Sequence, residues 1–268
     1  SDAGKTVLWE FTHKDDPHLG YTHSKPILMQ MNNGKWAAII GNGQGASGAD
    51  GTAGQAQLFI VYLDGPGGDG TWDLGKDYLR ISTGQGTAAR RNALFAPVGI
   101  DTVIPQDGKV DLIYAGDLYG NLWRFDVSGS SESSWSSPVK PFFKGDKTRP
   151  ITATPAVGIA PASVTDLAPM RTGALEQTHS VMVFFGSGRL LADANKAASI
   201  VNRFYGVYDD GSKIGLTEAN LTEQQRTYST ATARVYQNDL KVGYTRSAGS
   251  SKRGWYITLP DDGERVID

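Results

Sequence analysis

The chain has 268 residues, with 33 glycines, 12 prolines, no cysteine and a formal net charge of -2. The lack of cysteine excludes disulfide bonds, thiol nucleophiles and zinc sites with Cys ligands. The near-neutral charge gives no support to a polyanionic partner, so we expect no nucleic-acid binding. No apolar run reaches the length of about 18 residues that a membrane-spanning helix needs, so we expect no membrane span in this chain.

Three copies of one pattern follow one another along the chain. Each copy opens with a proline before a short apolar run, at Pro26, Pro97 and Pro155. A second apolar run ends on a glycine-rich turn, and a third run, rich in aromatic residues, ends at an aspartate. Alternating apolar and polar residues are typical of a strand with one buried face, and short Gly/Asn loops join such strands into antiparallel hairpins. The second and third runs are residues 36–40 and 58–64, 112–115 and 122–126, and 181–185 and 203–209.

A fourth, outer strand is predicted after each copy, at residues 78–82, 139–143 and 233–236. Three four-stranded repeats predict an all-β protein, a β-propeller with about three full blades and long loop insertions. The alternative is a β-sandwich whose strands are similar by chance.

Each end of the chain is predicted to belong to a further blade. Residues 5–11 are expected to form the last strand of a preceding blade, and residues 254–259 part of a following one. We therefore expect a longer protein, in which this chain is part of one propeller domain. The expected blades and partial blades are 1–23, 24–95, 96–152, 153–250 and 251–268.

The segments between the predicted strands are expected to form surface loops, because most are rich in Gly, Ser and Asp. They are residues 44–55, 65–75, 128–137 and 160–178. Residues 216–225 are the best helix candidate, with Thr217 or Thr222 as the N-cap. Four tryptophans at strand positions are expected to pack in the core or between blades: Trp9, Trp36, Trp123 and Trp255. Trp72 and Trp135 lie in insertions, where an exposed aromatic side chain could bind a partner.

Six segments, in order, resemble the C-terminal propeller of the PilC/PilY type IV pilus tip proteins. They are LWEFTHKDDPHLGYTHSKP, NGKWAAIIGNG, YAGDLYGNLWRFD, FFGSGRLL, FYGVYDDGS and GWYITLPDDGERV. The resemblance implies a secreted protein at the outer surface or pilus tip of a Gram-negative bacterium. It implies a non-enzymatic role in pilus assembly, in opposing retraction and in adhesion. The implied partners are pilus subunits or minor pilins and a host-cell receptor.

The family also implies a calcium loop just before the YAGD strand. The matching positions are Val103, Pro105, Asp107, Lys109 and Asp111. Calcium prefers six to eight oxygen ligands, so Asp107 and Asp111 fit the pattern, and Lys109 fits only through its backbone carbonyl. Val103 and Pro105 offer no side-chain oxygen, and Asp101 is a substitute ligand if the loop rearranges. The alternative is a plain β-turn at residues 106–109, supplied by Asp-Gly.

Other groupings of polar residues give weaker signals. His13, His18 and His23 lie near two aspartates, but their five-residue spacing fits no single strand or helix face, so surface histidines are expected. Ser187 lies between glycines without the five-residue nucleophile pattern, and Lys144-Gly145-Asp146 resembles an integrin-binding tripeptide. Quinoprotein dehydrogenases use similar propellers, which leaves a cofactor enzyme as an alternative. A second alternative is a calcium-switched regulatory module, in which Asp107 and Asp111 hold an ion that controls pilus retraction. No convincing acid–base grouping, and hence no catalytic residue, is found.

Overall fold

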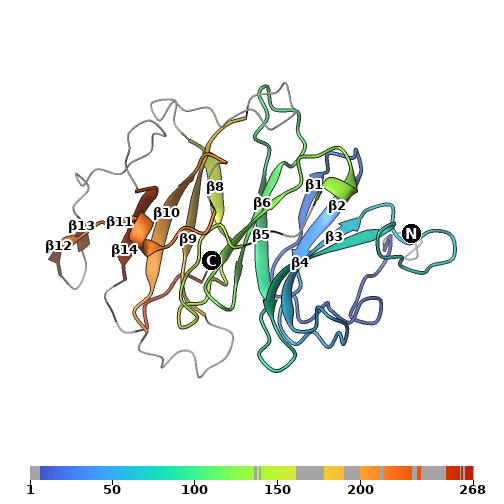
Figure 1. Ribbon diagram of the computed structural model, residues 1–268, viewed down its shortest axis with the longest axis horizontal. Helices are drawn as coiled ribbons and strands as arrows, with labels where there is room; N and C mark the ends of the chain where they lie inside the picture. The colour runs from blue at the N-terminus through green and yellow to red at the C-terminus, as the bar shows by residue number, and fades with distance from the viewer. Residues whose placement is uncertain are drawn as a thin grey trace.

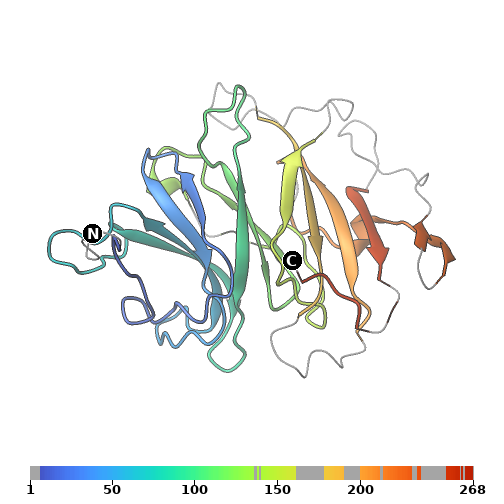
Figure 2. The ribbon, with the colours of Figure 1, turned by 180° about the vertical axis from the view of Figure 1, so that it is seen from behind.

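The computed structural model describes residues 7–135, 138, 140–160, 178–189, 200–211, 214–230, 234–236, 252–259, 261 and 263–267. Within these residues the chain forms β-strands and two short 3-10 helices, η2 (Glu132–Ser134) and η5 (Glu218–Asn220). The three larger sheets lie one after another along the long axis of the molecule (Figures 1 and 2). No helix among the described residues is long and apolar enough to cross a membrane.

The sheets follow the predicted repeats. The first contains β1 (Ile27–Gln30), β2 (Trp36–Gly41), β3 (Gln55–Tyr62) and β4 (Tyr78–Gly86), each antiparallel to the next. The second contains β5 (Leu94–Ile100), β6 (Leu112–Asp117) and β7 (Leu122–Asp126). The third has the order β11 (Thr222–Glu223), β14 (Gly254–Thr258), β10 (Arg203–Asp209), β9 (Val181–Gly186) and β8 (Ala156–Ile159). A separate hairpin pairs β12 (Arg226–Ser229) with β13 (Arg234–Tyr236).

Strand alternation decides which neighbour each side chain meets. In β3, Leu58 and Ile60 pack toward the second sheet, while Phe59 and Val61 belong to a cluster on the opposite face. The central strand β6 is buried on both faces, because its residues alternate between two cores. This double burial explains why the sequence of β6 is almost continuously apolar.

The second strand of every repeat ends in the same type of junction. It is a glycine followed by a buried polar residue: Asn42, Asp117 or Ser187. In each case that side chain accepts a hydrogen bond from a backbone N–H in or next to the third strand. The bonds are Gln57 N to Asn42 Oδ1 (3.1 Å), Asn121 N to Asp117 Oδ1 (2.8 Å) and Arg203 N to Ser187 Oγ (2.9 Å). Three different residue types therefore make one repeated contact.

The glycine in each junction permits a close approach to a neighbouring segment. A Cβ atom at Gly41 would lie 2.3 Å from the carbonyl oxygen of Phe95, at the start of β5. At Gly116 it would lie 2.4 Å from the carbonyl oxygen of Ile151, and at Gly186 2.1 Å from Cγ2 of Val266. These glycines are required for space, whereas Gly120, with φ of 77°, supplies the positive φ of the turn after β6.

The third sheet corrects two sequence predictions. Gly254–Thr258, expected to start a following blade, is β14 and pairs along its length with β10. The predicted outer strand at residues 233–236 instead contributes β13 to the separate hairpin. The strand β14 follows a long insertion in the sequence and pairs with β10 of the same sheet. Its Trp255 side chain packs over Gly206 of β10, where an added Cβ would lie only 2.6 Å from Cε2 of Trp255.

The other predicted outer strands have mixed outcomes. Residues 78–82 lie within β4, as expected. Of residues 139–143, Val139 lies outside the described residues, and Phe143 forms single bridges to Leu122 and Leu216 rather than a strand. At the N-terminus, residues 7–11 form no strand, and residues 5–6 lie outside the described part.

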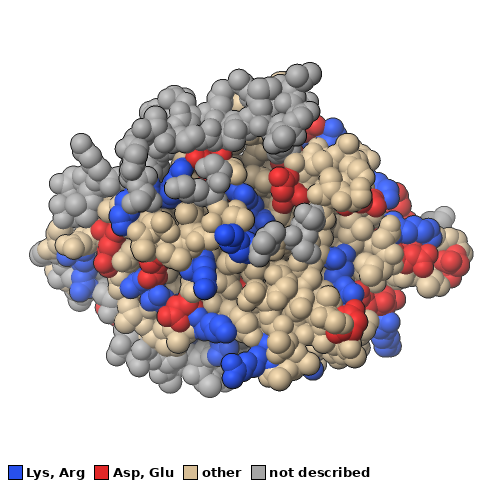
Figure 3. Space-filling model, in the orientation of Figure 1, with Lys and Arg blue, Asp and Glu red and all other residues tan. Residues whose placement is uncertain are grey.

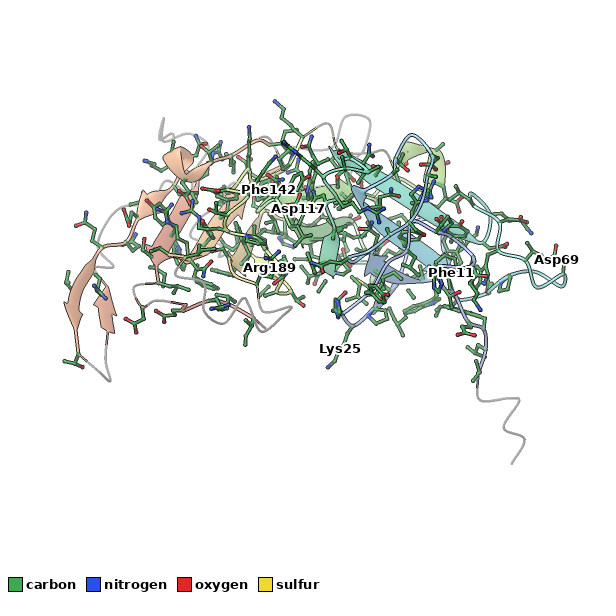
Figure 4. All side chains as sticks on the ribbon, turned by 90° about the horizontal axis from the view of Figure 1, so that it is seen from below. Phe11, Lys25, Asp69, Asp117, Phe142 and Arg189 are labelled. Atoms are coloured by element: carbon green, nitrogen blue, oxygen red, sulfur yellow. The ribbon has the colours of Figure 1, made fainter. Side chains whose placement is uncertain are left out.

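Residues 7–11 contact the first sheet through aromatic side chains. Trp9 and Phe11 each make an edge contact with Trp72, at 5.1 and 5.0 Å between ring centroids. Figure 4 shows Phe11 against the first sheet, whereas Asp69 extends away at the end of the β3–β4 loop. The predicted helix at 216–225 is reduced to η5, where Thr217 N donates to Asn220 Oδ1 at 2.9 Å.

Three tryptophans differ in solvent exposure from the sequence prediction: Trp36, Trp72 and Trp135. Trp72 and Trp135 are buried, because their loops fold back and each indole N–H donates to a backbone carbonyl, Glu10 for Trp72 and Gly129 for Trp135. Trp36, expected to pack, is 53% exposed. Trp123 is fully buried in the core between the first two sheets, as predicted.

Candidate functional site

The loop between β5 and β6 contains the predicted calcium residues. Asp111, the last residue before β6, is 1% exposed. Its Oδ2 accepts hydrogen bonds from Thr102 N at 2.7 Å, Thr102 Oγ1 at 3.0 Å and Val103 N at 3.1 Å. Asn32 Nδ2, from the β1–β2 turn, lies 3.4 Å from Asp111 Oδ1. Asp111 thus joins the start of the β5–β6 loop to its end and contacts the β1–β2 turn of the first sheet.

The other acidic residues of the loop are also engaged. Asp101 accepts from Val103 N through one oxygen and from Gly108 N, at 2.7 Å, through the other. Asp107 accepts from Lys109 N at 2.9 Å, and the Lys109 ammonium lies 2.7 Å from its second oxygen. These hydrogen bonds with Lys109 lower the pKa of Asp107. Gly108 has φ of 81°, as an Asp-Gly turn requires.

This arrangement does not form a calcium cage. Calcium needs six or more oxygens turned toward one point, but the loop carboxylates face backbone N–H groups and the Lys109 ammonium. Among the described residues, no group of three or more His, Asp or Glu side chains is placed to hold a metal. Calcium binding at Asp101, Asp107, Lys109 and Asp111 stays a prediction, and it requires these contacts to break.

A second polar cluster was missed in the sequence. His13 and His23 are exposed, but His18 is buried between Asp16 and Asp50. Its Nδ1 lies 2.9 Å from Asp16 Oδ1 and its Nε2 lies 2.8 Å from Asp50 Oδ1. Arg80 of β4 donates to both aspartates, at 2.9 Å in each case. Thr52 also donates to Asp50, which lowers the pKa of that carboxyl group.

This cluster connects three segments that are distant in sequence: the N-terminal segment, the insertion after β2 and β4. Gly48 lies against the His18 ring, since a Cβ there would be 2.2 Å from Nε2. The Arg80 guanidinium supplies positive charge between the two carboxylates, so the arrangement is an internal clamp rather than a metal site. The spacing of Asp16 and His18, two residues apart, is the sequence signal that could have indicated this cluster.

Two further buried carboxylates lie at the junctions between sheets. Asp117 receives four N–H groups: Asn92 Nδ2, Asn121 N, Asn121 Nδ2 and Trp123 Nε1. Burial raises the pKa of Asp117. Asp209 accepts from Tyr114 OH at 2.7 Å and pairs with Arg124 at 2.6 Å. Figure 4 shows Asp117 in the middle of the molecule. The residue is fully buried, so its carboxylate stabilises the junction between the sheets.

The remaining sequence signals are also part of the framework. Ser187 is 1% exposed, and its hydroxyl donates to Asn202 Oδ1 at 3.2 Å. Lys144-Gly145-Asp146 lies in a turn in which Asp146 accepts from Thr148 N at 2.8 Å. Gly145 packs closely against Gly120, because a Cβ at Gly145 would lie 2.0 Å from the Gly120 carbonyl oxygen.

Successive, mainly antiparallel sheets with one repeated junction are the blades of a β-propeller, and the described sheets do not close into a ring. The sequence matches the family described as the PilY1 beta-propeller domain over residues 8–245. The chain therefore belongs to the PilY1 β-propeller domain family, and the predicted resemblance and fold class are confirmed.

Individual relatives agree with this assignment. The chain is 30% identical over 282 residues to a type IV pilus biogenesis factor PilY1 homolog of Xylella fastidiosa, covering 96% of the chain. It is 29% identical over 295 residues to the type IV pilus biogenesis factor PilY1 of Pseudomonas aeruginosa, covering 97%. The crystal structure of the Pseudomonas aeruginosa PilY1 C-terminal domain has a similar fold, with a TM-score of 0.68 at 24% identity over 94% of the chain.

The chain is shorter than each of these relatives. It spans 16% of the Xylella protein and 23% of the Pseudomonas protein. It also covers 53% of the solved C-terminal domain.

Proposed function

We propose that this chain is a structural module of a type IV pilus biogenesis factor. The observation that carries the proposal is the family match over residues 8–245, together with the names of the relatives as biogenesis factors. The module presents loops from a rigid stack of sheets to pilus subunits or minor pilins. We further propose that it is secreted, is located at the bacterial surface or pilus tip, opposes pilus retraction and contributes to adhesion to a host-cell receptor.

The arrangement of the buried polar groups supports a non-enzymatic role. Asn42, Asp117 and Ser187 are each committed to backbone hydrogen bonds at the blade junctions. Asp16, His18 and Arg80 hold loops together. A catalytic acid, base or nucleophile must reach a substrate, and these groups face the protein interior instead. A scaffold is therefore favoured over the quinoprotein-like alternative.

The experiment is an in-frame deletion of the coding segment for residues 24–267 in the bacterium that encodes the chain. Surface pili are quantified after shearing, and twitching and attachment to host cells are measured in parallel. We expect fewer surface pili and weaker attachment. In a strain whose retraction motor is also inactivated, pili should return if the module opposes retraction.

A control allele checks that not every change in this segment impairs the pili. An allele with Asp69→Asn, at an exposed loop position, is expected to behave like the parent strain. Normal piliation, twitching and attachment in the deletion strain would overturn the proposal. Quinone-dependent dye reduction by the purified protein would instead support the enzyme alternative.

A further inference from the structure

Five segments meet at one end of the second and third sheets and enclose a pocket of about 240 Å³. The lining residues are Leu118 after β6, Lys147, Thr148 and Pro150 before β8, Gly188 and Arg189 after β9, Ile200 and Asn202 before β10, and Arg265 near the end of the described chain. The pocket is separate from the predicted calcium loop, since the two sets of lining residues share no member.

The pocket is strongly cationic. Lys147, Arg189 and Arg265 line it, and none of its nine lining residues is acidic. The nearby Asp146 is turned into its own loop, where one oxygen accepts from both the backbone N–H and the hydroxyl of Thr148. The end of the chain lies toward the viewer in Figure 2, so Figure 3 shows the opposite face, where Lys and Arg side chains are interspersed with Asp and Glu. Three like charges around one small space favour an anionic occupant.

The cationic side chains are held in place by neighbouring groups. The Lys147 ammonium lies 4.4 Å from the centroid of the Tyr119 ring. The Arg265 guanidinium donates to the carbonyl oxygens of Arg189, at 2.9 Å, and Gly263, at 2.7 Å. Two bonds of this kind fix the plane of the guanidinium, which is the group that best matches the paired oxygens of carboxylate and phosphate.

The backbone around the pocket is also built for this contact. Gly188 has φ of 140°, and a Cβ there would lie 2.4 Å from Cβ of Arg265. A glycine at this position thus allows Arg265 to approach the end of β9. The buried Asn202 donates to the carbonyl oxygens of Ile200 and Glu264, at 3.2 and 2.8 Å, which joins two walls of the pocket.

Beside the polar Thr148 and Asn202, the lining also has an apolar part, formed by Leu118, Pro150 and Ile200. We propose that this pocket binds a small organic oxyanion, a carboxylate or a phosphate monoester whose apolar part lies against these three residues. The cationic side chains bind the charged oxygens. This site goes beyond the proposed scaffold function and does not depend on it.

The test measures binding of four probes to the full chain by calorimetry, with all four compared at the same ionic strength and the series repeated at higher salt. Hexanoate and phenyl phosphate carry the anionic group on an apolar body, and hexanamide and phenol are their neutral counterparts. We expect saturable binding of at least one anionic probe, weakening as salt is added, and no saturation by the neutral compounds. The anionic probe with the higher affinity shows whether the pocket prefers a carboxylate or a phosphate monoester.

Matched variants locate the binding. The double variant Lys147→Gln/Arg189→Gln removes two exposed charges from the pocket and should weaken binding at least about tenfold. The control Lys144→Gln/Arg90→Gln removes two exposed charges outside it and should bind like the parent. Thermal unfolding of both variants checks that the fold is retained. The proposal is overturned if no anionic probe saturates, if the neutral probes bind equally, or if the pocket variant binds normally.

Discussion

Asp107 and Asp111 both match the calcium pattern, yet their carboxylates have different surroundings. Asp111 is buried and accepts three hydrogen bonds from Thr102 and Val103. Asp107 is partly exposed and pairs with Lys109. Local sequence does not distinguish the two, because the burial of Asp111 is created by β6 and by Asn32 of the neighbouring sheet.

The first prediction concerns stability. Asp111→Ala removes a buried carboxylate that accepts from the Thr102 N–H and hydroxyl and is one of two acceptors of the Val103 N–H, so we expect it to lower the free energy of unfolding by about 2–4 kcal/mol. Asp107→Ala removes an exposed pair and should cost less than about 1 kcal/mol. Urea unfolding of both variants without calcium measures the difference, and equal effects would contradict the assigned roles.

The second prediction concerns calcium. Calorimetric titration of the chain is expected to give no saturable heat that disappears in Asp107→Ala/Asp111→Ala, because Lys109 already neutralises Asp107. Removing that ammonium and adding a carboxylate with Lys109→Asp should raise the calcium affinity. Saturable heat in the parent chain that vanishes in the double variant would instead show that the loop rearranges around calcium and would support a calcium-switched module.

The glycines at the blade junctions determine how closely neighbouring strands and segments pack. Gly116 ends β6, and a Cβ there would lie 2.3 Å from Cγ2 of Ile151 and 2.4 Å from its carbonyl oxygen. Ile151 also donates its N–H to the Asp117 carbonyl, so displacing it disturbs the contact between the second sheet and the segment leading to β8. The sequence suggested a turn glycine at this position, whereas the requirement is for space between neighbouring segments.

The third prediction follows from this contact. Gly116→Ala should lower the free energy of unfolding by about 1–3 kcal/mol, since the added methyl group overlaps backbone that is already hydrogen-bonded. Gly158→Ala in β8 is the matched control, because no heavy atom lies within 4 Å of its added Cβ. Denaturant unfolding compares the two variants. A neutral Gly116→Ala substitution would show that the segment containing Ile151 can move aside without cost.

At the scale of the whole molecule, the stacked sheets enclose aromatic rings between them and beneath their loops. Among the described residues, burial raises the pKa of five tyrosines: Tyr62, Tyr78, Tyr114, Tyr205 and Tyr256. For Tyr205 the pKa is raised to about 12. These hydroxyl groups come from all three sheets, so their ionisation reports on the stack as a whole.

The fourth prediction is a loss of stability in alkali. A tyrosine whose folded pKa is raised stabilises the fold fully below the unfolded value of about 10, and this contribution is lost as pH rises through the folded value. Ultraviolet absorbance of tyrosinate should therefore show a delayed component that rises together with unfolding. Tyr114→Phe should reduce that component, and Tyr21→Phe, at a position 73% exposed, should leave it unchanged. A single early transition in the folded protein would contradict the prediction.

The sequence by itself determined the repeated strands. Alternation and glycine-rich turns are local features, and β2, β3, β6, β7, β9 and β10 lie where these features predict. The six ordered segments likewise sufficed to indicate the family, because they preserve the order of the blades.

Only the tertiary structure decided the contacts that cross long loops. The pairing of β14 with β10, the burial of Trp72 and Trp135, and the position of His18 between two aspartates depend on segments far away in the sequence. The same holds for the cationic pocket, whose five segments are adjacent only after the sheets stack. The physical reason is that backbone pattern fixes a strand locally, whereas burial and charge pairing depend on which surfaces pack together.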